Sequence, residues 1–338
     1  APEAEIVVRQ NGYGLRPKAL EVMENILQGN PEIDVVFGCN DDSALGAMSA
    51  MEAAGKDPAK SLVIGFDGTN DAFRAIQDGG MFRADIVQRP DLISRTQMEI
   101  AIKIARGEAK VEDFPAPTYI KTPVVTAENV DAWMEWGGDP AKAPAEEAAA
   151  APAGEEKPVK IGVIQITLEH EYQITLNNGF KAKAEEMGAE TVFCINELNP
   201  EKHVKCGEDL IAAGVNAIIQ APADPASFKA VADMAKAKGI PVINDGSPQP
   251  IMEGVVPFIG TDSLGGGYLA GVFAGNWINE NLGGKAIVAT LDLPTFTDCV
   301  ARVDGFEKGL AETAPEAEIV VRQNGYGLRP KALEVMEN

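Results

Sequence analysis

The chain begins and ends with the same 25 residues. Residues 1–25 read APEAEIVVRQNGYGLRPKALEVMEN, and residues 314–338 repeat that string without a mismatch. The period of 313 residues is far longer than the roughly 20–50 residues of a solenoid unit, and perfect identity excludes a diverged duplication within one domain. Two accounts remain: a circular permutant whose ends overlap, or a window cut from head-to-tail copies of one 313-residue unit.

Either account places original chain ends inside the sequence. Residues 138–158 consist almost entirely of Ala, Pro, Glu, Gly and Lys, a composition that cannot bury a core and is typical of a linker. In the inferred native order the protein starts near Lys157, and only one copy of EIVVRQNGYG can occupy its strand. We expect the first copy to do so, because it continues into residues 26–29 and its helix is whole. The second copy is then displaced or available for domain swapping.

The charge balance excludes some partners. The 338 residues carry 29 basic and 51 acidic side chains, a net charge of −22, which argues against nucleic acid and anionic membranes. A 45% hydrophobic, 6% aromatic composition is ordinary for a globular chain, and no apolar run reaches the roughly 18–20 residues of a membrane span. The length favours two domains.

In the inferred order, short Val/Ile-rich runs alternate with helical patterns in two series, which is typical of βαβ units and parallel sheets. The first series has expected strands at 160–166, 191–195, 217–220 and 240–244, with helices at 177–187, 202–213 and 226–238. The second has expected strands at 286–291, 319–323 (or 6–10), 34–38, 62–66 and 84–88. Two such series predict two doubly wound α/β lobes.

Four segments resemble the ribose-type sugar-binding proteins of bacterial ABC importers: FGCNDDSALGAMSAMEAAGK (37–56), VIGFDGTNDAFRAIQDG (63–79), ADIVQRPDLI (84–93) and GIPVINDG (239–246). The resemblance covers the whole 313-residue unit once it is rotated, and it extends to the ligand domains of lactose-repressor-type regulators. It implies the periplasmic binding protein type I fold, circularly permuted, with Rossmann-like lobes joined by a three-strand hinge that crosses near Thr261, Arg89 and Ile120.

The resemblance also implies a division of the chain. Residues 1–88 and 263–338 would form the second lobe, with 314–338 duplicating 1–25. Residues 89–120 would return to the first lobe, and 121–137 would be a hinge crossing and the original C-terminal tail. Residues 138–158 would join the original termini, and 159–262 would form the body of the first lobe.

The candidate ligand residues follow the strands. Ligands of open parallel sheets bind beyond the carboxyl ends of the strands, where the strand order switches. Amides and carboxylates at such positions suit hydroxyl groups, and aromatic faces suit the C–H side of a sugar ring. The candidates are His170, Tyr172, Gln173, Asp245, Gly246, Asp298, Cys299, Tyr13, Tyr326, Asn40, Asp67 and Gln88.

The resemblance sharpens some of these roles. It gives Tyr172 a first-lobe stacking position and Tyr326 or Tyr13 the second-lobe one, and it places Asn40, Asp67 and Gln88 at hydroxyl-binding positions. His170 stands where ribose-type members often have Asn.

Other features of these segments have plainer interpretations, and the sequence also departs from the family. Asp41 and Asp42 are expected to cap the following helix. The family's Arg in the loop after the fourth strand is absent here, where the stretch reads Asn244-Asp245-Gly246-Ser247. A second family Arg gives way to Cys299 or Val300, with Arg302 the nearest base, which disfavours ribose itself as the ligand.

The cysteines and histidines offer two alternatives. Cys194 and Cys206 are expected to form a disulfide, given an extracytoplasmic location. Together with His203 they could instead be zinc ligands, although C-x8-H-x2-C lacks paired C-x2-C spacing and His203 is expected to be solvated. Cys39 and Cys299 could be bonded or free. No catalytic triad, metal site or cofactor is expected, and the run Gly265–Gly267 is interpreted as helix packing rather than a dinucleotide motif.

The sequence therefore predicts a non-enzymatic, periplasmic or extracellular solute-binding protein. It would capture a sugar or polyol by hinge closure and deliver it to an ABC permease, as a monomer or as an oligomer swapped through the duplicated strand. The alternative is the ligand-sensing domain of a lactose-repressor-type regulator, or a signalling receptor for a small hydroxylated molecule. No helix-turn-helix pattern precedes Lys160 to support the regulator.

Overall fold

The computed structural model describes residues 9–11, 15–134, 158–167, 171–246, 250–294, 297–315 and 317–321. The chain divides into two compact units. Unit 1 comprises residues 1–88, 121–137 and 262–338, and unit 2 comprises residues 89–120 and 138–261. Except for Pro158, the predicted linker 138–158 lies outside the described residues.

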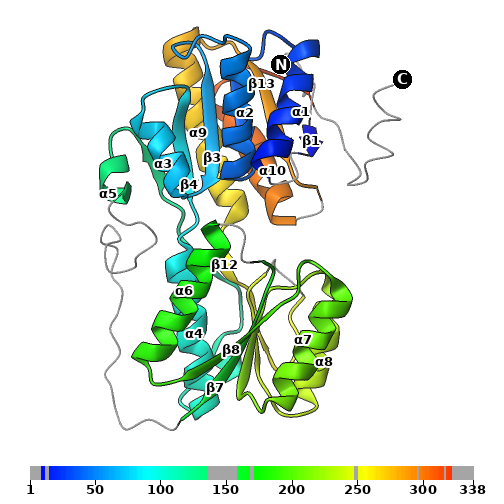
Figure 1. Cartoon of the computed structure of the whole chain (residues 1–338). Coiled ribbons are helices and arrows are strands. Elements are labelled where there is room, and N and C mark those ends of the chain that lie inside the picture. The colour runs from blue at the N-terminus through cyan, green and yellow to red at the C-terminus, as the bar shows by residue number, and fades with distance from the viewer. Residues whose placement is uncertain are drawn as a thin grey trace. The chain divides into compact units, whose positions relative to one another are not determined.

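Unit 1 is built on a mostly parallel sheet, as the alternation of strand and helix patterns predicts (Figure 1). Its strand order is β13–β2–β3–β4–β6, with β1 and β14 both paired to the outer edge of β13. The strands are β1 (Arg9–Asn11), β2 (Val35–Gly38), β3 (Leu62–Asp67), β4 (Phe82–Val87), β6 (Val124–Thr126), β13 (Ile287–Asp292) and β14 (Glu318–Val321). The short strand β6, which runs antiparallel to β4, is an addition to the predicted strands.

Helices cover both faces of this sheet. Alternate residues such as Val35 and Phe37 pack into one core with α9 and α10, while α1, α2 and α3 lie on the opposite face (Figure 1). The helices are α1 (Arg16–Gly29), α2 (Asp41–Ala53), α3 (Asn70–Gln77), α5 (Val130–Met134), α9 (Ser263–Leu282) and α10 (Thr297–Thr313).

Small residues let α9 and α10 touch backbone to backbone. A Cβ at Gly267 would lie 2.0 Å from the carbonyl oxygen of Arg302, and one at Gly271 would lie 2.1 Å from that of Phe306. The Asp262 side chain caps α9 by accepting from the Gly265 N–H at 2.9 Å. The interpretation of the Gly-rich run as helix packing is thus confirmed, and the packing fixes where α10 presents Arg302.

Two half-strands share one edge of unit 1, which contradicts the expectation that only one copy of the duplicated segment can occupy the strand. The second copy supplies β14, paired with the start of β13, and the first copy supplies β1, paired with its end. Both pairings are parallel. A single edge position thus accommodates part of each copy, because each covers only half of the length of β13.

Unit 2 has a parallel sheet of strand order β11–β10–β9–β7–β8, and a separate pair formed by β12 and β5. Its strands are β5 (Thr118–Ile120), β7 (Lys160–Gln165), β8 (Glu190–Ile195), β9 (Ala217–Gln220), β10 (Val242–Asn244), β11 (Val255–Val256) and β12 (Ile259–Thr261). Its helices are α4 (Pro90–Arg106), the 3-10 turn η1 (Val111–Asp113), α6 (Glu171–Glu186), α7 (Pro200–Ala212) and α8 (Pro225–Lys236).

The two faces of this second sheet bury separate cores. Ile161 and Val163 pack with α4 and α6 on one face, whereas Ile164 and Ile218 pack with α7 and α8 on the other. Helix α6 begins six residues earlier than the predicted start at residue 177. None of the described helices combines the length and apolar character that a bilayer crossing requires.

Candidate functional site

The carboxyl ends of the unit 1 strands gather a polar cluster around Asp67, the last residue of β3. Gln88, directly after β4, donates its Nε2 to the Asp67 Oδ1, and the Arg302 Nη1 lies 3.5 Å from the same oxygen. Arg302 comes from α10, and its side chain is 9% exposed. Its Nη1 also donates to the Cys39 carbonyl at 2.8 Å, and its guanidinium lies 4.2 Å from the centroid of the Phe66 ring. Three elements thus hold one buried cation against a carboxylate and an aromatic face.

The carboxylates beneath this cluster compete for charge. Burial raises the pKa of Asp67 to about 7, the neighbouring Asp41 acts in the same direction, and the Arg302 guanidinium opposes it. Burial likewise raises the pKa of Asp41 to about 6. Burial and the nearby Asp41 hold the pKa of Asp85 well above its usual range. Each of these three acids therefore holds its proton up to a higher pH than an exposed aspartate does.

Asn40 and the two aspartates after it lie at the N-terminus of α2. Asn40 caps α2 by accepting from the Ser43 N–H at 3.0 Å, while Asp41 accepts from the Thr69 N–H at 2.9 Å and its Oγ1 at 2.8 Å. Asp41 is therefore a buried brace between α2 and α3 and not a cap. The expectation that Asp41 and Asp42 cap the helix is wrong, because the cap position falls on the residue before them.

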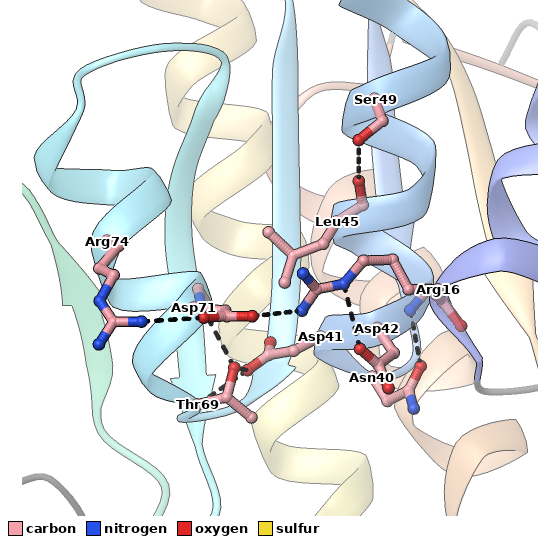
Figure 2. A network of polar contacts seen from close by, with 11 residues as sticks. Arg16, Asn40, Asp41, Asp42, Leu45, Ser49, Thr69, Asp71 and Arg74 are labelled. Carbon is pink, nitrogen blue, oxygen red and sulfur yellow. Dashed lines mark hydrogen bonds and ion pairs between the residues drawn. The ribbon is translucent and has the colours of Figure 1, made fainter. Parts of the chain in front are cut away.

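A cation at the start of α1 ties three helix N-termini together (Figure 2). Arg16 lies 3.3 Å from Asp42 on α2 and 2.8 Å from Asp71 on α3, and Asp71 also pairs with Arg74 at 3.1 Å. These side chains are roughly a third to two thirds exposed, so each pair contributes little stability. The network links the N-termini of α2 and α3, the helices that follow Asn40 and Asp67 in the chain.

Two predicted residues lie at the start of α10. Cys299 is buried, and it and Cys39 are free thiols, which resolves the alternatives left open by the sequence. The pKa of the Cys39 thiol lies well above its usual range, mainly because of a hydrogen bond with Cys299 and next because of burial. The thiol therefore stays neutral. Asp298 is partly buried, and its charge favours the cationic form of Arg302.

Unit 2 has a counterpart around Asp245, which follows β10. The Gln97 Nε2 donates to one carboxylate oxygen at 2.8 Å, and the Gln165 Nε2 donates to the other at 2.5 Å. Burial raises the pKa of Asp245 to about 6, against these two amides, which favour the ionised form. The Oε1 atoms of Gln97 and Gln165 are buried and lack a partner among the described residues. This cluster therefore holds two unused acceptors.

Gly246 lies where the chain leaves no room for a side chain. Its N–H donates to the Asn244 Oδ1 at 3.0 Å, and a Cβ at this position would lie 2.2 Å from the Cδ of Pro222. Any larger residue would have to displace that proline. Tyr172 and Gln173 lie on α6, both partly buried, and Tyr172 packs against the core between α6 and the sheet.

Unit 2 also contains a buried arginine, Arg89, which the sequence reasoning placed near a hinge crossing and not among the site residues. Arg89 grips Asp91 in a bidentate pair with both distances 2.9 Å, and its backbone is in the left-handed region at φ 60°. Gln97 and Arg302 were also missed or underrated as site residues, because a polar residue inside a helix gives no positional signal until its neighbours are known. The tripeptide Arg-Pro-Asp, with proline opening a helix, was the one local hint.

His203 is buried and not solvated, which corrects the prediction. Its Nδ1 lies 3.0 Å from the Asn196 Nδ2 and its Nε2 lies 2.8 Å from the Gln220 Oε1. The predicted disulfide between Cys194 and Cys206 is confirmed. Because both sulfurs are bonded to each other, they are unavailable as zinc thiolates, which overturns the zinc alternative.

The remaining predicted positions, His170, Tyr13 and Tyr326, lie outside the described residues. Within the described ranges, no three His, Cys, Asp or Glu side chains gather in a way that could hold a metal ion.

The chain belongs to the family described as "Periplasmic binding protein domain", whose profile matches residues 1–109 and 161–338. It is 42% identical over 118 residues to the ribose import binding protein RbsB of Bacillus subtilis (strain 168), a match covering 35% of this chain and 37% of that protein. It is 42% identical over 100 residues to RbsB of Escherichia coli (strain K12), covering 30% of this chain and 33% of that protein. The D-allose-binding periplasmic protein of Escherichia coli (strain K12) is 32% identical over 119 residues, covering 35% of this chain and 38% of that protein.

These matches define a class of protein. The first two relatives are named as ribose import binding proteins, and the third as a periplasmic protein that binds D-allose. The chain spans about a third of the length of each of them, from 33% to 38%.

Proposed function

We propose that the chain is a solute-binding protein that captures a sugar or polyol for delivery to an ABC permease. The observation that carries this proposal is the pair of clusters at the carboxyl ends of the two parallel sheets. Each cluster sets a carboxylate among amide or guanidinium donors and leaves buried polar atoms unpaired among the described residues: the Arg302 Nε in unit 1, and the Oε1 atoms of Gln97 and Gln165 in unit 2.

The chemistry of these atoms suits hydroxyl groups. A hydroxyl both donates and accepts, so it can satisfy an unpaired Nε–H, an unpaired amide oxygen or a carboxylate lone pair without bringing charge. A buried polar atom without a partner costs free energy, and a ligand that pairs it recovers that cost on binding. In this proposal the ligand contacts both lobes, as the resemblance to the ribose-type family implies, and a three-strand hinge closes on it.

We further propose that the sequence is a circular permutation of the family's order, with residues 138–158 joining the original termini. The support is the exact duplication of residues 1–25 and the position of the Ala/Pro-rich stretch in the sequence. The proposed location is periplasmic or extracellular, in secreted or lipid-anchored form, which suits a chain carrying the Cys194–Cys206 disulfide. The proposed state is a monomer, and an oligomer swapped through the duplicated strand is the alternative.

A ligand screen tests the function. Pentoses, hexoses, their alcohols and glycerol are added separately, and thermal unfolding is followed, because a ligand that binds only the folded state raises the midpoint. We expect at least one of them to raise it. Asp67→Asn and Asp245→Asn should each weaken that ligand about tenfold or more, since each replaces a carboxyl oxygen by an amide nitrogen that cannot accept a hydrogen bond.

Asp233→Asn is the matched control. Asp233 pairs with Lys229 at 2.6 Å on an exposed face of α8, so this change should leave affinity unaltered. If no sugar or polyol stabilises the protein, or if the control weakens binding as much as the two site variants, the proposal is overturned.

A further inference from the structure

The edge of β13 is covered by two pieces of backbone that come from opposite ends of the chain. Glu318 and Ile319 of β14 stand opposite Ile287 and Val288, and Val321 stands opposite Ala289. Arg9, Gln10 and Asn11 of β1 then stand opposite Thr290, Leu291 and Asp292. The register therefore continues along β13 from one piece to the other, with an irregularity only between Val288 and Ala289.

The two pieces are complementary in sequence. Residues 318–321 repeat residues 5–8, and in the repeated string these are followed directly by the residues of β1. Read along β13, β14 and then β1 spell EIVVRQN once. The span from residue 9 to residue 321 contains 313 consecutive residues, so it includes each position of the repeating unit once.

Each half-strand is also followed or preceded in the chain by residues whose sequence is identical to the other half-strand. Residues 322–324 follow β14 and are identical to β1, while residues 5–8 precede β1 and are identical to β14. Moving the junction by one residue therefore replaces one backbone pairing on β13 with a chemically identical one. Parallel pairing rests on backbone N–H and C=O groups, and here the side chains do not change either.

We propose that the edge of β13 is a strand-exchange site, a binding site for an extended EIVVRQN segment that either copy of the duplicated sequence fills. The first copy can supply the whole segment through residues 5–11, and the second can supply it through residues 318–324. In both cases α10 stays connected to the second copy and α1 stays connected to the first copy, so the rest of unit 1 is undisturbed. The inference is independent of the ligand of the protein.

Paired prolines in the full-length chain test this proposal. Alternate N–H groups along a strand face the same neighbour, so two consecutive prolines remove one donor toward β13 whichever residue carries it. The single-copy variants are Val7→Pro/Val8→Pro, Val320→Pro/Val321→Pro, Arg9→Pro/Gln10→Pro and Arg322→Pro/Gln323→Pro. The both-copy variants combine the first with the second, and the third with the fourth.

The readout is the thermal unfolding midpoint. Each single-copy variant should stay within about 2 °C of the parent, because the intact copy takes the place, whereas each both-copy variant should fall by about 5 °C or more. A fixed junction gives a different pattern: Val320→Pro/Val321→Pro and Arg9→Pro/Gln10→Pro would each be as damaging as the corresponding combination. That pattern overturns the proposal, and so does a combination that leaves the midpoint unchanged.

Discussion

Replacing Arg302 by methionine should destabilise unit 1 in a pH-dependent way. Methionine has a similar length and fills the same space, but it lacks the charge and the donors. The change removes the 2.8 Å hydrogen bond to the Cys39 carbonyl, the contact with the Phe66 ring and the cation facing Asp67. All three losses occur at a side chain that is 9% exposed, so water cannot replace them.

The magnitude follows from these contacts. A hydrogen bond from a charged group contributes about 1.5–3 kcal/mol and a desolvated cation–π contact up to about 2 kcal/mol. With the retained packing of the methionine stem, we expect a loss of about 3 kcal/mol at pH 6. At pH 8 Asp67, whose pKa is about 7, is mostly ionised in the parent. Without Arg302 the pKa of Asp67 rises further. Because pH 8 is one unit above the parent pKa, this rise can add at most about 1.4 kcal/mol there, so the loss at pH 8 should reach about 4 kcal/mol.

Urea denaturation at pH 6 and pH 8 measures this difference. Arg74→Met is the control, because Arg74 makes an exposed pair with Asp71, and its loss should stay within about 0.5 kcal/mol at both pH values. Introduced into Asp67→Asn protein, Arg302→Met should cost the same at pH 6 and pH 8, since Asp67 can no longer ionise opposite the cation. An equal loss at pH 6 and pH 8 for Arg302→Met would refute the coupling between Arg302 and Asp67.

Two further predictions concern the second unit and the helix packing. Asp245 has a folded pKa of about 6 against an ordinary 3.8, so its stabilising contribution is complete below pH 4 and is lost as the pH rises through 6. Asp245→Asn should therefore reduce the fall in unfolding free energy between pH 5 and pH 8 by about 1 kcal/mol, as measured by urea denaturation. An unchanged pH dependence of that free energy would contradict this. Gly267→Ala would place a Cβ 2.0 Å from the Arg302 carbonyl and should cost about 1–3 kcal/mol or more, whereas Gly29→Ala, with nothing within 4 Å, should be neutral or stabilising. Equal effects of the two alanines on the thermal midpoint would show that the contact of α9 with α10 is not tight.

The strand and helix pattern was accessible from sequence because both signals are local. A buried parallel strand such as Leu62–Asp67 is a short run of apolar residues, and the residue that ends it is a site candidate by position alone. This reasoning placed Asp67, Gln88 and Asp245 at the carboxyl ends of strands, and the structure surrounds Asp67 and Asp245 with polar donors.

The partners of these residues were beyond reach because they come from helices. Arg302 and Gln97 lie within the helices α10 and α4. In the sequence of a helix, a buried polar residue cannot be told apart from an exposed one. Only the packing of the helix decides which of them points toward a strand end. His203 shows the converse error, since a histidine among charged helix residues suggested solvation, yet it is held between Asn196 and Gln220.

The duplicated segment limits prediction for a different reason: its two copies are identical, so no local sequence signal distinguishes them. Two identical strings have identical propensities, so the sequence alone cannot favour one over the other except through what each is attached to. The attachment argument favoured the first copy, whose helix α1 is complete, and α1 is indeed preceded by first-copy residues in β1. The same argument, applied to the other end, favours the second copy, since α10 runs directly into β14. Each copy is thus favoured at the end where its covalent neighbour is already folded, and a strand divided between them satisfies both connections at once.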